Sequence, residues 1–123
     1  MEKLNQQEEK AMRKIWNLGP FVVRMLQNEY PDPKPPYTTV ASIVKNLERK
    51  KYLRSRRVGN VYEYFAEVQP DDYKKAYIKD AVSNYFSNSY KELVSFFAKE
   101  EEISKKDLQD VIHMIEEGKK GDK

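Results

Sequence analysis

An amphipathic helix that runs directly into a hairpin is the feature that most restricts how this chain can fold. Over residues 37–49 the apolar side chains recur at the spacing of one helical face. Residues 53–58 and 61–68 are then rich in β-branched and aromatic side chains, and Gly59-Asn60 between them is a two-residue hairpin signal. Because such a helix buries only one face, the hairpin and the preceding segments must cover it.

Two further helices are predicted before this segment. Asn5 and Glu8 have the spacing of a capping box at the start of the first, and Gly19 suits its C-terminal end. Pro20 suits the first position of a second helix, ending near Tyr30, with these apolar residues at helical spacing: Phe21, Val22, Met25 and Leu26. Four prolines then form a rigid connector. Three helices followed by a hairpin is the order of a winged helix-turn-helix.

The helix at 37–49 has two chemically different faces. The apolar face carries Tyr37, Val40, Ile43, Val44 and Leu47. The opposite face, with its flanks, carries hydroxyl, amide and basic side chains: Thr38, Thr39, Ser42, Lys45, Asn46 and Arg49. Small hydroxyl residues let a helix approach base edges closely, and Lys or Arg reach guanine edges or phosphates. The hairpin adds three arginines suited to phosphate contact: Arg54, Arg56 and Arg57.

Charge is concentrated in the same region. The whole chain has a net charge of +3, but residues 34–60 hold 8 Lys and Arg against 1 Asp or Glu, a net charge of +7. Such a patch is typical of a polyanion-binding surface, although a solvated charged face has the same composition. The order of helices and hairpin favours the nucleic-acid interpretation. Tyr62 and Tyr64 alternate with Glu63 on the second strand, so both are expected to face inward.

The C-terminal part is predicted to contain three short amphipathic helices. They begin near Pro70, at a capping box Ser89-x-x-Glu92 and at Ser104-x-x-Asp107, and Gly118 is expected to end the last. Helices this short cannot bury their apolar faces alone, so we expect them to pack against a second copy of the chain. The predicted dimer contacts are apolar: Tyr85, Leu93, Val94, Phe96, Phe97, Leu108, Val111, Ile112 and Ile115.

The predicted fold class is therefore mainly α with a small β-hairpin wing, a winged helix-turn-helix followed by a helical dimerisation domain. Residues 1–69 form the predicted DNA-binding domain, residues 70–118 the dimerisation domain, and residues 119–123 a disordered tail.

Several kinds of chemistry have no support in the sequence. The chain contains no cysteine, which excludes disulfides, thiolate metal sites and cysteine nucleophiles. His113 is the single histidine and has no partner at catalytic or metal-binding spacing, and the acidic run at 100–102 suits a solvated helix end. No phosphate-binding glycine motif is present. We expect no enzyme activity, cofactor or metal.

Localisation is inferred from hydropathy. No apolar run approaches the roughly 18 residues that a membrane-spanning helix requires. The first ten residues, MEKLNQQEEK, do not resemble a signal peptide. The expectation is a cytoplasmic protein without membrane insertion.

Four stretches in order resemble the BlaI/MecI family of bacterial repressors. They are EEKAMRKIWNLG, YTTVASIVKNLERKKYL, GNVYEYFAEV and ELVSFFAKEEEIS, and the resemblance covers roughly residues 4–117. It implies a homodimer that binds an inverted-repeat operator and represses genes of antibiotic resistance or stress response. By family position, the operator-facing residues would be Thr38, Thr39, Ser42, Lys45 and Asn46.

The resemblance also implies a mode of regulation. In the β-lactam-responsive branch a membrane sensor-protease system controls cleavage within the dimerisation domain, and the matching bond here would be Phe96–Phe97. The copper-responsive branch uses a C-terminal cysteine motif that this chain lacks. Many relatives place a basic residue at the wing tip where Asn60 stands, so Arg56 and Arg57 are expected to provide that contact. The alternative function is a winged-helix adaptor that binds protein rather than specific DNA.

Overall fold

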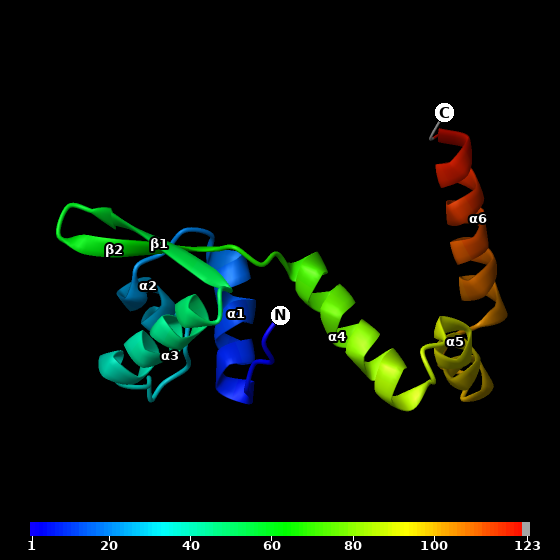
Figure 1. The fold of residues 1–123 in the computed structure, drawn as a ribbon, viewed down its shortest axis with the longest axis horizontal. Coiled ribbons are helices and arrows are strands. Elements are labelled where there is room, and N and C mark those ends of the chain that lie inside the picture. The colour runs from blue at the N-terminus through cyan, green and yellow to red at the C-terminus, as the bar shows by residue number, and fades with distance from the viewer. Residues whose placement is uncertain (122–123) are drawn as a thin grey trace. The chain divides into compact units, whose positions relative to one another are not determined.

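The computed structural model describes residues 1–121, with side chains to residue 118, as two compact units. Unit 1 comprises residues 1–76 and unit 2 residues 77–123. The elements, in chain order, are α1 (Gln6–Leu18), α2 (Val23–Asn28), α3 (Tyr37–Arg49), β1 (Leu53–Val58), β2 (Val61–Ala66), α4 (Pro70–Tyr85), α5 (Tyr90–Lys99) and α6 (Lys105–Gly121) (Figure 1). This is the predicted fold class, six helices and one hairpin over the described residues.

Both predicted ends of α1 are confirmed. The Asn5 side-chain oxygen accepts a hydrogen bond from the Glu8 backbone amide at 2.8 Å, and the Glu8 carboxylate accepts one from the Asn5 backbone amide at 2.9 Å. At the other end Gly19 has φ 74° and donates to the Ile15 carbonyl at 3.1 Å. Because side chains disfavour this left-handed backbone conformation, glycine suits the position.

The second helix is shorter than predicted. It begins at Val23, and Phe21 instead forms an antiparallel bridge with Tyr64 of β2. The Phe21 amide donates to the Tyr64 carbonyl at 2.9 Å, and the Tyr64 amide donates to the Phe21 carbonyl at 2.7 Å. Their rings lie 5.7 Å apart. The prediction that Pro20 starts the helix was wrong because this bridge holds the following residue in an extended conformation.

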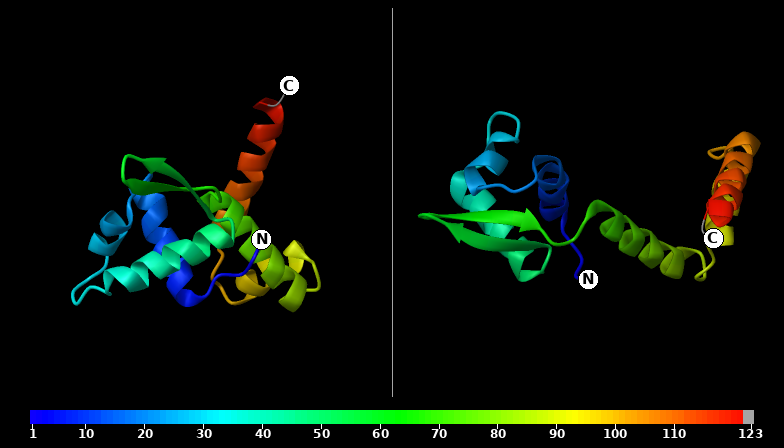
Figure 2. Two further views of the ribbon diagram at one scale, coloured as in Figure 1. Left: turned by 60° about the vertical axis from the view of Figure 1, so that its left-hand side comes forward. Right: turned by 90° about the horizontal axis from the view of Figure 1, so that it is seen from above.

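The first three helices and the base of the hairpin lie together in unit 1 (Figure 2). Their buried apolar side chains form one hydrophobic core. The apolar face of α3 is buried as predicted, at Val40, Ile43, Val44 and Leu47. The other buried apolar residues of this core are Ala11, Met12, Ile15, Phe21, Val23, Leu26, Tyr52, Leu53 and Tyr64. Tyr37 was predicted to share the buried face but is 47% exposed, because it is the first residue of the helix, at its outer end.

The hairpin has the predicted turn and a slightly shorter second strand. β1 and β2 are antiparallel, with Val58 opposite Val61 beside the Gly59-Asn60 turn, and β2 ends at Ala66. Tyr62 and Tyr64 lie on one face of β2, yet Tyr64 is 5% and Tyr62 54% exposed. The inward prediction for Tyr62 was wrong because the hairpin tip extends past α3, beyond the core (Figure 1).

Unit 2 contains the end of α4 together with α5 and α6. The Ser89 hydroxyl accepts from the Glu92 amide at 3.1 Å at the start of α5. Ser104 and Asp107 cap α6 reciprocally, at 3.0 and 3.2 Å. Gly118 does not end α6, which continues to Gly121, because nothing requires a left-handed conformation at that glycine. The predicted disordered tail therefore begins within a helix, and residues 122–123 lie outside the described part of the chain.

No helix within the described residues has the length and hydropathy needed to cross a membrane.

Candidate nucleic-acid interface

The outward face of α3 presents every side chain that the sequence assigned to it. All six are exposed: Thr38, Thr39, Ser42, Lys45, Asn46 and Arg49. The helix follows Pro36, whose carbonyl accepts from the Thr39 and Val40 amides at 3.0 and 3.2 Å. The hydroxyl residues therefore occupy the first turns, and the two cations lie further along. Short polar side chains therefore lie at the N-terminal end of this face, and longer basic side chains lie towards its C-terminal end.

The C-terminal end of α3 is fixed to α1 by a buried ion pair. Lys50 Nζ lies 2.7 Å from Glu8 Oε1, and the Glu8 side chain is only 3% exposed. Burial alone would raise the pKa of Glu8, but the hydrogen bond from Lys50, the Asn5 amide and the nearby positive charges together lower it. The sequence indicated Glu8 only as a cap, because its partner is 42 residues away along the chain.

The turn between α3 and the hairpin also holds the helix in place. Lys51 has φ 69°, and the Tyr52 amide donates to the Leu47 carbonyl at 2.9 Å. The Ser55 hydroxyl of β1 then donates to the Glu48 carboxylate of α3. The face of the hairpin that carries Ser55 is therefore turned towards α3.

The three wing arginines differ in their surroundings. Arg56 Nε donates to Glu63 Oε1 at 2.8 Å, and Arg54 lies 3.9 Å from Glu67. Arg57 donates to the Gly59 carbonyl at 3.2 Å, and no carboxylate of the described residues lies within ion-pair distance of it.

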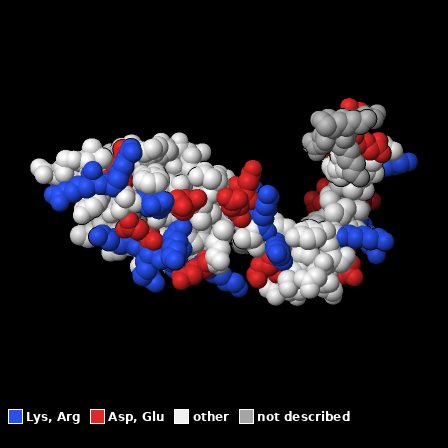
Figure 3. Space-filling view, turned by 45° about the horizontal axis from the view of Figure 1, so that its top comes forward, with Lys and Arg blue, Asp and Glu red and all other residues white. Residues whose placement is uncertain are grey.

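Strand alternation separates these arginines onto two faces. Arg57 is two residues beyond Ser55 and opposite Tyr62, so it lies on the face turned towards α3. Arg54 and Arg56 lie on the other face. Figure 3 shows basic side chains along the hairpin with acidic ones close by. Of the five described basic residues predicted to contact DNA, three are exposed and have no carboxylate within ion-pair distance: Lys45, Arg49 and Arg57.

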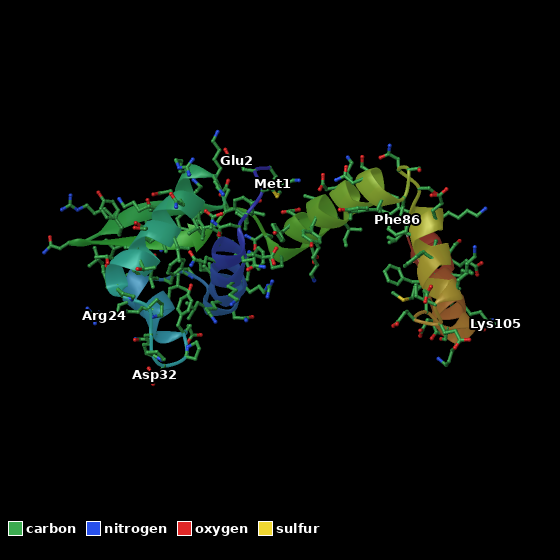
Figure 4. The ribbon with its side chains drawn as sticks, turned by 90° about the horizontal axis from the view of Figure 1, so that it is seen from below. Met1, Glu2, Arg24, Asp32, Phe86 and Lys105 are labelled. Carbon is green, nitrogen blue, oxygen red and sulfur yellow. The ribbon has the colours of Figure 1, made fainter. Side chains whose placement is uncertain are left out.

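One exposed pair beside this surface was missed by sequence reasoning. The Arg24 guanidinium of α2 lies 5.9 Å from the centre of the Tyr37 ring at the start of α3. Figure 4 shows Arg24 at the outer edge of unit 1. The position of Arg24 in the predicted second helix does not indicate a contact with Tyr37, because the contact depends on how the two helices cross.

The predicted dimer residues form incomplete apolar surfaces in unit 2. Seven of them are exposed, from 38% for Val94 and Phe97 to 81% for Tyr85, while Leu93 and Leu108 are half-buried. Phe86 follows α4 (Figure 4). Its ring lies 5.8 Å from that of Phe96. Val82 is the only residue of unit 2 that is fully buried among those described.

The described residues contain no group of three or more potential ligands that could hold a metal ion. His113 is exposed, with Nε2 4.0 Å from Glu117 Oε1.

A family model for the penicillinase repressor matches residues 4–117 of this chain. The chain belongs to the penicillinase repressor family. A penicillinase repressor of Staphylococcus aureus is 26% identical over 73 residues, which cover 59% of this chain and 58% of that relative's length. The resemblance seen in the sequence is thus confirmed at the level of the family, and the winged-helix order is compatible with it.

Proposed function

We propose that this family member is a transcriptional repressor that binds an inverted-repeat operator as a homodimer. The outward face of α3 carries the proposal, because the opposite face of the same helix forms the core of unit 1. A helix anchored in this way can enter a major groove without disturbing the fold. Family membership supports the same function.

Each part of the surface has a proposed role. Thr38, Thr39 and Ser42 allow close approach to the bases, while Lys45 and Asn46 contact base edges. Arg49 and Arg57 contact phosphates, and Arg54 and Arg56 contribute less because carboxylates already neutralise them. Asn60 at the exposed tip is neutral, so the proposal assigns it no phosphate contact.

Dimerisation is proposed through the apolar faces of unit 2. Phe96, Phe97 and Ile112 are exposed there, and a second copy would remove them from water. Two linked α3 helices would then reach successive major grooves about 34–36 Å apart. Linking two half-site contacts raises affinity well beyond that of one.

Relief of repression is proposed to follow cleavage of the Phe96–Phe97 bond, through a membrane sensor-protease system. Both residues lie within α5, seven and eight positions into a ten-residue helix. Cutting there would divide the proposed dimer surface between two fragments. The consequence would be a weaker dimer and loss of operator affinity.

The first experiment compares Arg57→Ala with the matched variant Arg56→Ala. An inverted repeat selected from random duplexes is titrated by fluorescence anisotropy at several salt concentrations. We expect affinity to fall steeply with salt, and Arg57→Ala to reduce the slope of log K against log salt by about 1. Arg56→Ala should change the slope less, because Glu63 is its partner.

Two outcomes would count against the proposal. A flat salt response, or no inverted repeat selected at all, contradicts operator binding. A protein partner retained from the same preparation, with no binding to any duplex, would favour the adaptor function instead.

A further inference from the structure

The beginning of α4 is attached to the DNA-binding unit. α4 extends from Pro70 to Tyr85, whereas unit 1 extends to residue 76. The predicted domain boundary after residue 69 would instead make the Gln69-Pro70 junction a natural hinge. The contacts around the helix start decide whether that junction can bend.

The segment before α4 is fixed by three hydrogen bonds. The Tyr52 carbonyl accepts from the Glu67 and Val68 amides at 2.8 and 3.3 Å. The Trp16 indole Nε1 of α1 donates to the Val68 carbonyl at 2.9 Å. The backbone of residues 67 and 68 is therefore held by α1 and by the turn after α3.

Tyr73, in the first turn of α4, adds contacts through both its ring and its hydroxyl. Its ring lies 5.7 Å from that of Trp16 and 6.0 Å from that of Tyr52. Its hydroxyl donates to Glu9 Oε2 at 2.6 Å, and Glu9 also pairs with Arg13 at 2.5 Å. The hydrogen bond from Tyr73, followed by that from Arg13, lowers the pKa of Glu9, so the acceptor is ionised at neutral pH.

We propose that Tyr73, Glu9 and Trp16 form a clamp that sets the direction in which α4 leaves the DNA-binding unit, and thereby limits the half-site spacing that the dimer accepts. The inference rests on the proposed function, since spacing matters only to a dimer on an inverted repeat. Tyr73 is a positioning residue: it acts through the helix and touches no DNA.

The physical reason is the stiffness of a helix compared with a linker. A helix held at its first turn by a ring packed between two others and by a charged hydrogen bond has few directions available to it. Adding one base pair moves a half-site by about 3.4 Å and rotates it by roughly 35°. A dimer whose α4 helices are held in one direction loses affinity when a half-site is shifted and rotated in this way. A dimer whose α4 helices move freely adjusts to the new position and keeps its affinity.

The test uses the full chain and duplexes built from the selected inverted repeat. The two half-sites are kept constant while the spacer is lengthened or shortened by one, two and three base pairs, and a duplex with a single half-site is included. For the unaltered protein we expect a two-base-pair change to reduce affinity at least about tenfold. Tyr73→Ala should reduce this discrimination to about threefold or less, with single-half-site affinity kept within about twofold.

Milder variants keep the test decisive if Tyr73→Ala folds poorly. Tyr73→Phe retains the ring contacts and loses the hydrogen bond, so an intermediate loss of discrimination is expected. Glu9→Ala should match it, and the double variant should add nothing further, because both remove one interaction. Arg13→Ala is the matched control, since it removes the other partner of Glu9 and leaves Tyr73 in place.

Three results would overturn the clamp. In the first, Tyr73→Ala and Tyr73→Phe keep the spacing discrimination of the unaltered protein. In the second, they lose affinity equally on the single half-site, which would assign Tyr73 to the stability of unit 1. In the third, the unaltered protein accepts all spacings equally while still binding the repeat; this removes the clamp and leaves operator binding intact. Failure of the unaltered protein to select a repeat removes both proposals.

Discussion

The two units of this chain differ in where their apolar side chains lie. Unit 1 encloses thirteen buried apolar residues in one cluster, including large side chains such as Phe21, Met12 and Tyr52. Among the described residues of unit 2, only Val82 is buried, and residues as large as Phe96 and Ile112 remain exposed.

The difference shows that an amphipathic pattern alone does not give an independent fold. α3 and α5 both have a clear apolar face, but α3 has two helices and a hairpin to cover it. The three helical segments of unit 2 offer too little surface to do the same for one another. We therefore expect unit 1 to be stable by itself and unit 2 to depend on a partner.

The largest expected effect comes from a charge on the exposed face of unit 2. Phe97→Asp should convert the proposed dimer to a monomer and reduce operator affinity on the order of 10²-fold or more, because linked half-site contacts become independent. Sedimentation equilibrium and anisotropy titration measure the two effects. Phe97→Leu is the matched control and should remain dimeric. A dimeric Phe97→Asp protein with normal operator affinity would place the interface elsewhere.

Replacing one leucine by alanine in each unit tests this difference in stability between the units. Leu47→Ala empties a fully buried site in unit 1 and should lower the free energy of unfolding by about 2–5 kcal/mol at every protein concentration. The single tryptophan, Trp16, lies in unit 1, so its fluorescence reports that transition.

The matched change in unit 2 is Leu108→Ala. Its effect, followed by circular dichroism, should depend on protein concentration, because stability there is linked to association. Concentration-independent unfolding of unit 2 would show that it folds without a partner.

The smallest expected effect concerns the buried pair between Glu8 and Lys50. Because the folded pKa of Glu8 is below its ordinary value of 4.5, the pair stabilises fully above that pH and is lost as the pH falls through the folded pKa. Lys50→Met should cost roughly 1–3 kcal/mol at pH 7, with the difference shrinking in acid. Lys51→Met, which removes an exposed charge next to it, is the control; denaturant titrations from pH 3 to 7 give both. An equal cost at all pH values would contradict the ionic contribution.

Local signals determined much of this protein. The caps at Asn5, Ser89 and Ser104, the turn at Gly59 and the apolar spacing of α3 act over a few residues, so the sequence predicts the elements they define. The exposed polar face of α3 was also predicted in this way, since it depends on residues close together in the chain. The family resemblance depends instead on four stretches in order, each of which is visible in the sequence.

Tertiary structure alone decided the features that join distant residues. Phe21 lies outside α2 because its backbone pairs with Tyr64. Tyr62 is exposed because the tip of the hairpin extends beyond the core. Strand alternation places Arg56 and Arg57 on opposite faces of the hairpin, but only the Ser55–Glu48 contact decides that the face carrying Arg57 is turned towards α3. Glu8 pairs with Lys50, and Tyr73 contacts Glu9 and Trp16, across separations of 42 to 64 residues along the chain. Periodicity and capping describe neighbours along the chain, whereas these contacts depend on how complete elements pack.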